Sequence, residues 1–268
     1  CLNMQKIEMY CVTNKDVPYL NKTPYNLAAV GGGEFSKNYL RCDYNDNIFY
    51  KEKNYSELTF HYWYWKNMLN STKSEWIGFC QRRRFWIKNE SVGQRIDVKN
   101  LNDHLLTHIP DNIGNIESII CKSISVTGSK RSKIFKRGWR NIIKNPLILF
   151  NRKKHNILLH FDMYHGYGNL NKAINFMNDE DREDFRNFVQ ANNVFNPHIM
   201  FISKHEVLDK WFKSLFPWLE RCEKVFGFND LLGYDKTRLY AYLAERYLSF
   251  WFKKYTKYLE QPWITIET

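Results

Sequence analysis

KIEMYCV at residues 6–12 is a short β-rich run, and the polar residues TNKD at positions 13–16 follow it directly. The β-branched and aromatic side chains of the run predict a strand, and the polar residues predict a loop at its carboxyl end. This order is typical of α/β folds, in which ligands bind beside the carboxyl ends of the strands. The stretch therefore predicts an α/β sheet with a polar loop at its binding edge.

Strands and helices alternate through the rest of the chain. Apolar runs predict further strands at residues 75–80, 116–126, 157–159 and 200–202, and amphipathic spacing predicts helices at residues 56–67, 101–107, 178–190, 205–226 and 236–259. Ser56 and Asn178 are suitable N-cap residues, and Pro217 predicts an interruption of the fourth helix. The pattern predicts one α/β domain over residues 1–268 with a helical C-terminal third.

The cysteines indicate the compartment. Six of them stand far apart, with none in a CxxC pair or at zinc-ligand spacing with histidine. Their apolar surroundings predict free core thiols in a reducing compartment. No apolar run approaches the roughly 20 residues that span a bilayer, and no signal peptide is recognisable. We therefore expect a cytoplasmic protein.

Positive charge is concentrated in one segment. Lysine and arginine exceed aspartate and glutamate by 12 over the chain, and ten bases with no acid fall in residues 128–154 among aromatic and aliphatic side chains. This composition is typical of an interfacial amphipathic segment, so we expect peripheral contact with an anionic membrane. The alternative is a nucleic-acid-binding protein whose bases follow a phosphate backbone. No RRM, KH or zinc-finger pattern accompanies the segment, so we expect no nucleic-acid partner.

WIGFCQRRRFW at residues 76–86 carries an apolar strand straight into Arg82, Arg83 and Arg84. Arginine grips phosphate oxygens in pairs through its planar, permanently charged fork. Three arginines at the end of a buried strand lose hydration unless an anion meets them. The alternatives are a solvated edge, or ion pairs with acids such as Glu57 or Glu245.

Two blocks of the chain resemble a family of bacterial glycosyltransferases that serve capsule and O-antigen assembly and were long catalogued only as a domain of unknown function. The first block is ELT at 57–59 with YW at 62–63 and WKN at 65–67, and the second is IGF at 77–79 with RRF at 83–85. The segment at 196–202, Arg238 and the pair Glu245-Arg246 fit the same family's closing pattern, so the resemblance spans nearly the whole chain.

The chain departs from the family pattern at two places. Gln81-Arg82 stands where the family has His-Tyr, and Ile199 stands where it has Asn. The first departure bears on the choice of donor or acceptor.

The resemblance implies a GT-A-like fold, which is a Rossmann-type mixed sheet with the nucleotide near the first strand. Family members transfer galactosyl units, some in furanose form, from UDP-sugars. The resemblance puts uracil and ribose beside Thr13, Asn14 and Lys15. It puts the donor diphosphate beside Gln81, Arg83 and Arg84, with Glu57, Arg82 and Arg238 as further candidates.

The resemblance also bears on the metal. Most GT-A enzymes hold Mn²⁺ or Mg²⁺ on the diphosphate with an Asp-x-Asp motif, and this chain has Gln81-Arg82-Arg83 at the corresponding place. Fixed guanidinium groups replace two acids and a cation electrostatically. We therefore expect no metal site and no required cofactor, with Arg83 and Arg84 stabilising the UDP leaving group. A Mn²⁺- or Mg²⁺-dependent reaction is the less favoured alternative.

An inverting transferase also needs a general base for the acceptor hydroxyl. The candidates are Asp162, His165 and Glu245. Asp162 and His165 share a predicted polar turn after the strand at 157–159, which is where a site loop belongs. The alternatives are a hydrogen-bonded core histidine, an aspartate that caps a helix, and a glutamate that orients a neighbouring arginine.

Taken together, the sequence predicts a glycosyltransferase that moves galactose, galactofuranose or an N-acetylated relative from a UDP-sugar. The expected acceptor is a growing capsule or surface polysaccharide, free or lipid-linked, met at the cytoplasmic face of the inner membrane. Besides the nucleic-acid-binding alternative, a noncatalytic sugar-nucleotide-binding module stays open because of Gln81 and Ile199. The linkage and the stereochemical course are not decided by the sequence.

Overall fold

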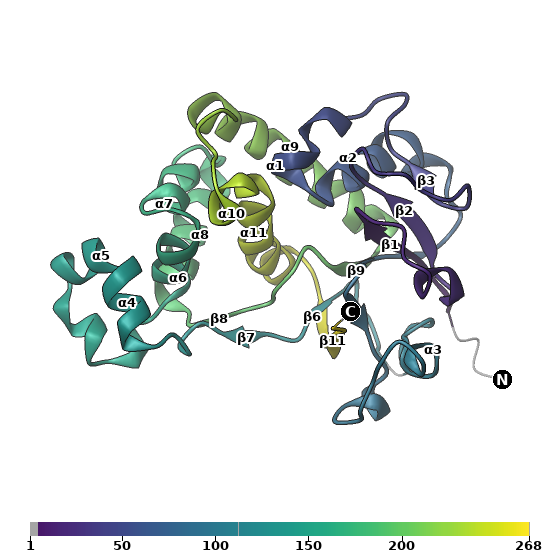
Figure 1. Cartoon of the computed structure of the whole chain (residues 1–268), viewed down its shortest axis with the longest axis horizontal. Coiled ribbons are helices and arrows are strands. Elements are labelled where there is room, and N and C mark those ends of the chain that lie inside the picture. The colour runs from purple at the N-terminus through teal and green to yellow at the C-terminus, as the bar shows by residue number, and fades with distance from the viewer. Residues whose placement is uncertain (1–4, 112, 268) are drawn as a thin grey trace. The chain divides into compact units, whose positions relative to one another are not determined.

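The computed structural model describes residues 5–111 and 113–267 (Figure 1). The chain divides into two compact units. Unit 1 comprises Cys1–Lys122, His198–Lys213 and Trp251–Thr268, and unit 2 comprises Ser123–Pro197 and Ser214–Phe250. Whether both units serve one glycosyltransferase domain, as predicted for residues 1–268, stays a prediction.

Unit 1 is built around a mixed sheet of nine strands within the described chain. Seven of them run in the order β10-β6-β9-β4-β1-β2-β3, and β5 joins β4 at one side and β11 at the other. The strands are β1 (Ile7–Thr13), β2 (Asn26–Ala29), β3 (Leu40–Arg41), β4 (Trp76–Gln81), β5 (Arg84–Trp86), β6 (Ser118–Cys121), β9 (Phe201–Lys204), β10 (Tyr258–Gln261) and β11 (Trp263–Thr265). β1 is parallel to β2 and β4, and β9 is antiparallel to β4 and β6. The mixed α/β sheet predicted from the sequence is confirmed.

The centre of the sheet is close-packed. β1 and β4 are almost entirely buried, which explains their continuous apolar sequences. Gly78 of β4 is required by this packing, because a Cβ there would lie 2.8 Å from Cε of Met9 and 3.0 Å from Cγ1 of Ile202. The predicted strands at 6–12, 75–80 and 200–202 therefore form adjacent strands of one sheet.

Helices and short 3-10 turns complete unit 1. They are α1 (Glu52–Tyr55), α2 (Leu58–Asn67), α3 (Leu101–His104), the first part of α9 (His205–Phe226), η1 (Leu20–Lys22), η2 (Phe49–Lys51), η3 (Leu69–Ser71) and η4 (Asn89–Ser91). α2 packs on the sheet through aromatic rings, with the Phe60 and Tyr64 centroids 5.5 and 5.0 Å from that of Tyr10. Ser56 is not the side-chain cap we expected: it has a φ of 52° and its carbonyl accepts from Thr59.

Unit 2 is mainly helical. Its elements are α4 (Arg131–Arg137), α5 (Trp139–Lys144), η5 (Pro146–Leu149), η6 (Arg152–Lys154), α6 (Ile157–His165), α7 (Asn169–Ile174), α8 (Asp179–Ala191), α10 (Tyr234–Thr237), the later part of α9, most of α11 (Leu239–Tyr255), and the paired strands β7 (Ile124–Ser125) and β8 (Val194–Phe195). Asn178 caps α8 as predicted, since its side chain accepts from the Asp181 amide. The buried side chains of Leu239, Leu243 and Tyr247 confirm the predicted inner face of the last helix.

Further local predictions were wrong. The last helix, expected over residues 236–259, is α11 and ends at Tyr255, and the chain then enters β10. The run at 157–159 is the first turn of helix α6 rather than a strand, because the Asn156 side chain caps the Leu159 amide. The helix expected at 101–107 ends at His104, and the strand expected at 116–126 is divided into β6 and β7. α9 continues through Pro217, where buried packing of neighbours such as Leu215 and Trp218 outweighs the hydrogen bond that proline cannot make.

The five cysteines of the described chain are all buried and free, as expected, and Cys1 lies outside the described residues. In the part of the chain that the structure describes, no helix is both long enough and apolar enough to cross a bilayer.

Candidate functional site

Three parallel strands of unit 1 end at one edge of the sheet. Thr13 at the end of β1 is in register with Ala29 of β2, and Val12 is in register with Gln81 at the end of β4. The Thr13 carbonyl accepts from the Val30 amide at 2.9 Å. The structure thus brings together Thr13 and Gln81, which were predicted separately as donor-binding residues, at the edge where α/β folds bind ligands.

The loop after β1 is held by its own hydrogen bonds. The buried Thr13 hydroxyl donates to the Lys15 carbonyl at 2.6 Å and accepts from the Lys15 amide at 3.0 Å. The side chains of Asn14 and Lys15 are exposed. This turn leaves both side chains open to a ligand at the carboxyl end of β1.

The glycine loop after β2 lies beside this turn. A Cβ on Gly33 would be 3.6 Å from the Asn14 carbonyl oxygen, so the two loops are in contact range. Asp16 holds the next segment by accepting from the Ser36 amide at 2.8 Å, and hydrogen bonds from Ser36 lower the pKa of its carboxyl. The glycine loop therefore lies at the same edge of the sheet as the Thr13 turn.

The arginine triplet forms a hairpin turn. Arg82 and Arg83 lie between β4 and β5, and Gln81 pairs with Arg84 across the antiparallel ladder. The Arg84 Nη1 donates to Oε1 of Gln81 at 2.9 Å, and the Arg83 Nε donates to the Ile266 carbonyl at 3.4 Å. The prediction that a buried strand runs directly into the arginines is confirmed.

In the described part of the chain the three guanidinium groups have no acidic partner. No carboxylate in residues 5–111 and 113–267 is within 4.0 Å of them. Arg82 and Arg84 are half-buried and Arg83 is exposed. Tyr19, which the sequence reasoning missed, donates its hydroxyl to the Arg82 carbonyl and fixes the turn. Burial raises the pKa of the Tyr19 hydroxyl to about 12. The turn therefore presents positive charge beside the carboxyl ends of β1 and β4.

Glu57 lies in the same unit at the start of α2. Its carbonyl accepts from the Phe60 amide at 3.1 Å and the His61 amide at 3.3 Å. Its side chain is half-buried. Glu57 makes no ion pair with Arg82, Arg83 or Arg84, so the alternative that it neutralises the triplet is not supported.

The three predicted catalytic residues all belong to unit 2. Asp162 is buried on α6, where its Oδ2 accepts from Nδ2 of Asn141 at 2.7 Å and its Oδ1 accepts from the Gly168 amide at 3.0 Å. Burial raises the pKa of its carboxyl, against the opposing effects of these hydrogen bonds and of Lys144. Through these two hydrogen bonds Asp162 of α6 holds α5 and the loop before α7 in place. This structural role is compatible with a second role as general base.

His165 lies at the end of the same helix. Its ring stacks on Tyr242 with centroids 3.7 Å apart, and its Nδ1 donates to the Asp235 carbonyl at 2.9 Å. Burial lowers the pKa of His165 to about 3 and that of His160 to about 4, and the nearby Arg246 charge acts in the same direction. Both imidazoles are therefore neutral at neutral pH, with Nε2 of His165 in its unprotonated form.

Glu245 pairs with its neighbour Arg246 on α11. The Arg246 side chain is only 2% exposed, lies over the rings of Phe161 and Phe195, and donates from Nη2 to Nδ1 of His160 at 3.3 Å. The ion pair therefore supports the alternative in which Glu245 orients a neighbouring arginine, and that arginine is Arg246. Arg238 is half-buried at the junction of α10 and α11.

The residues that sequence reasoning assembled thus fall into two sets. The predicted donor residues and Glu57 lie in unit 1, and Asp162, His165, Glu245 and Arg238 lie in unit 2. Within the described chain, no group of three or more His, Cys, Asp or Glu side chains is placed to hold a metal ion.

The fold class follows from the sheet and from a likeness to a solved structure. The apo structure of the WbbM bifunctional glycosyltransferase matches with a TM-score of 0.69 at 19% sequence identity, over 98% of this chain and 46% of WbbM. The unit 1 sheet and this match define a GT-A-like glycosyltransferase fold. The chain spans about half the length of WbbM.

The chain belongs to the family described as a domain of unknown function, DUF4422, whose model matches residues 8–257. The predicted membership of a family catalogued in this way is confirmed. The mannosyltransferase Ktr4p from S. cerevisiae matches with a TM-score of only 0.27 at 8% identity, over 83% of this chain and 65% of Ktr4p. A TM-score this low does not indicate a shared fold. No curated protein sequence matches the chain.

Proposed function

We propose that the chain is a glycosyltransferase that transfers a hexosyl unit from a UDP-sugar to a saccharide acceptor. The observation that carries the proposal is the arginine turn at the carboxyl ends of β1 and β4, whose guanidinium groups have no carboxylate partner in the described residues and lie beside the Thr13 loop. A diphosphate is the anion that this geometry suits, since arginine binds phosphate oxygens in pairs.

The nucleoside part of the donor has a natural place next to the turn. The exposed Asn14 and Lys15 and the glycine loop after β2 lie at the same edge and offer backbone and side-chain groups to uracil and ribose. In this arrangement Arg83 and Arg84 stabilise the negative charge that develops on the UDP leaving group.

We propose that the reaction proceeds without a divalent cation. The support is the chemistry at the end of β4, where Gln81 and three arginines stand, because positive groups repel a metal ion and already compensate the diphosphate charge. The comparison of UDP release with and without EDTA, described below, tests whether the reaction needs Mn²⁺ or Mg²⁺.

Asp162 is our choice for the general base, with His165 and Glu245 as the other candidates. A carboxyl whose pKa is raised by burial is better matched to proton abstraction at neutral pH than an imidazole with a pKa near 3. Glu245 is engaged with Arg246.

The acceptor class is also part of the proposal. Galactose, galactofuranose or an N-acetylated relative is the sugar that we expect to be moved to a growing capsule or surface polysaccharide. A lipid-linked acceptor would place the reaction at the cytoplasmic face of the inner membrane.

The decisive experiment is turnover of UDP-galactose and its N-acetylated relative with the purified chain, with and without EDTA. We expect UDP release in both conditions and a melting temperature raised by UDP. UDP release that EDTA abolishes and Mn²⁺ restores would refute metal independence. The absence of any UDP binding, with RNA binding in its place, would refute the glycosyltransferase itself.

A further inference from the structure

The segment at residues 128–154 of unit 2 carries two apolar sets that point in different directions. The inner set is Ile134 and Ile148, which pack with Leu159 and Met163 in a small core of their own. The outer set is exposed by half or more of each side chain and comprises Phe135 (65%), Trp139 (50%), Ile143 (71%), Leu147 (57%) and Phe150 (74%). Folding of unit 2 therefore leaves these five large apolar side chains exposed.

The outer apolar side chains follow the helical period. Trp139 and Ile143 are four residues apart on α5 and share one face of it, while Leu147 and Phe150 are three apart along η5. A monomeric protein rarely exposes so many large apolar side chains in one short segment unless they meet a partner.

Charge surrounds these side chains. All ten lysines and arginines of the segment are exposed, and the segment contains no acid. Arg137 pairs with Asp235 at 3.2 Å, and Lys133 lies over the Tyr164 ring at 4.5 Å. The other eight make no ion pair within the described chain: Lys130, Arg131, Lys136, Arg140, Lys144, Arg152, Lys153 and Lys154. The partner must therefore be anionic as well as apolar.

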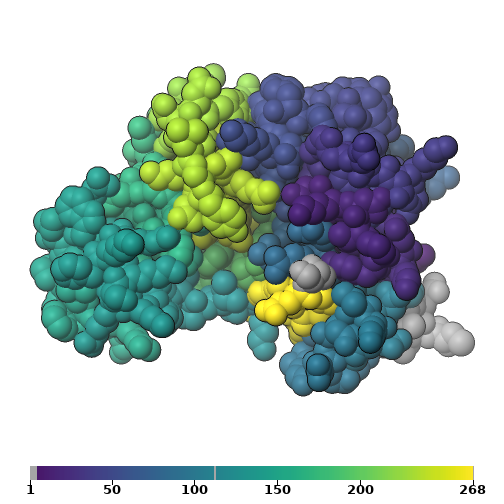
Figure 2. All heavy atoms as spheres, in the orientation of Figure 1, coloured from purple at the N-terminus to yellow at the C-terminus, as the bar shows by residue number. Residues whose placement is uncertain are grey.

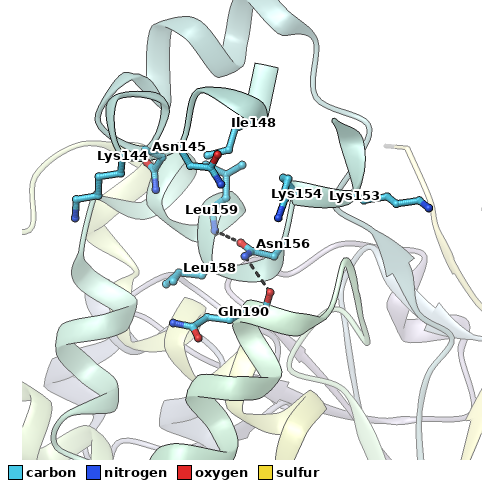
Figure 3. A pocket seen from close by; sticks show the side chains of 10 residues that line it. Lys144, Asn145, Ile148, Lys153, Lys154, Asn156, Leu158, Leu159 and Gln190 are labelled. Carbon is cyan, nitrogen blue, oxygen red and sulfur yellow. Dashed lines mark hydrogen bonds between the residues drawn. The ribbon is translucent and has the colours of Figure 1, made fainter. Parts of the chain in front are cut away.

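This segment also lines a cavity of about 460 Å³, together with Asn156, Leu158, Leu159 and Gln190 of the same unit (Figure 3). Its lining includes Lys144, Asn145, Lys153 and Lys154. The side-chain oxygen of Asn145 accepts from the Leu147 amide, so its NH₂ group is the part left for a ligand. Lysine ammonium groups and an amide donor suit a phosphate.

We propose that residues 128–154 form a membrane-docking face that binds an anionic phospholipid bilayer, with the outer apolar side chains in the acyl boundary and one headgroup phosphate in the cavity. In Figure 2 the atoms of this segment, in teal, form a continuous part of the molecular surface. The aliphatic members Ile143 and Leu147 favour a bilayer over nucleic acid, because aliphatic side chains do not stack on bases. This proposal does not depend on the transferase activity.

The test is flotation of the purified chain with phosphatidylcholine vesicles that contain about 30% phosphatidylglycerol, compared with phosphatidylcholine alone. We expect binding to the anionic vesicles that is at least about tenfold stronger and that weakens at high salt. The double variants I143S/F150S and K153E/K154E are each expected to lower the partition coefficient about tenfold or more. Binding by the wild type without preference for the anionic vesicles overturns the proposal, and so does wild-type binding by both variants.

Matched controls separate the docking face from general surface effects. L232S removes another exposed apolar side chain of unit 2, and K73E/K210E makes the same charge change on unit 1. Both controls are expected to bind anionic vesicles like the wild type. Equal loss in a control, tighter binding of wild type to single-stranded RNA than to vesicles at the same salt, or a dimer that I143S/F150S dissociates would each refute a bilayer as the partner.

Discussion

Gln81→Glu tests whether the arginine turn holds the donor diphosphate. The substitution keeps the shape of the side chain and puts a negative charge about where Oε1 now accepts from Nη1 of Arg84 at 2.9 Å. Arg84 then has a carboxylate partner, and its charge is no longer available to a ligand. Gln81 is only 7% exposed, so the new carboxylate loses hydration, but its charge-assisted hydrogen bond with Arg84 offsets this cost and we expect little change in folding stability.

The magnitude follows from Coulomb's law. One unit charge about 5 Å from a phosphate charge contributes roughly 3 kcal/mol at an effective dielectric constant of about 20. Solvent screening at the half-buried Arg84 reduces this value, so we expect a loss of about 1.4 kcal/mol, which is a tenfold increase in the Kd for UDP. Calorimetric titration of UDP measures it. Gln94→Glu, at an exposed position in the same unit, is the control for net charge.

Two results would refute this reasoning. If Gln81→Glu folds normally and binds UDP with unchanged affinity, Arg84 does not hold the diphosphate. If Gln94→Glu weakens UDP binding equally, the effect is one of overall charge rather than of the turn. Arg84→Ala is a less clean test, because it leaves the buried Oε1 of Gln81 without a donor at a cost of about 1–3 kcal/mol of stability.

Three further predictions concern buried polar groups. Arg246→Met is expected to destabilise the fold by about 3–5 kcal/mol, because it breaks the largely buried ion pair with Glu245. The double variant in which both residues become Met should recover much of this loss, as measured by thermal melting. Burial lowers the pKa of His61 to about 3, whereas the pKa in the unfolded chain is about 6.5. As the pH falls below 6.5 the unfolded chain therefore takes up a proton that the folded chain does not, and the free energy of unfolding decreases. Denaturant titrations near pH 5.5 should show that His61→Phe removes about 1.4 kcal/mol of this acid destabilisation. Asp162→Asn should lower kcat by roughly 100-fold, because it removes the proposed general base. It should also lower the free energy of unfolding by about 1–2 kcal/mol, because an amide oxygen cannot replace both carboxylate oxygens as acceptors from Asn141 and Gly168. A folded variant with unchanged kcat would exclude Asp162 as the base.

The sequence predicts the centre of the sheet well, because burial on both faces leaves a clear mark. β1 and β4 are continuous apolar runs that end in polar residues, and this pattern can be recognised in the sequence without knowing which strands lie beside them. It does not predict that Phe85 and Trp86 form a strand, since β5 exists by pairing with β11, which lies far along the chain. Long-range pairing has no local signal in one sequence.

Unit 2 shows a different limit. The apolar run at 157–159 is too short for its period to separate a strand from a helix. Asn156 was the available signal, because it is a good N-cap and its side chain accepts from the Leu159 amide. The partners of the candidate site residues, such as Tyr19 for Arg82 and Asn141 for Asp162, come from distant positions and could not be predicted.

The arginines of the two units have different surroundings, which is the basis for proposing that those of the turn bind a ligand. Arg246 is buried with Glu245 beside it and with Phe161 and Phe195 against its planar group, so its charge is compensated inside the fold. Among the described residues, the side-chain partners of Arg83 and Arg84 are a carbonyl and a carboxamide, both neutral, at an edge where parallel strands end. A neutral acceptor orients a guanidinium group without cancelling its charge. The turn therefore keeps a fixed, uncompensated positive field, which is the property that binding of a nucleoside diphosphate requires.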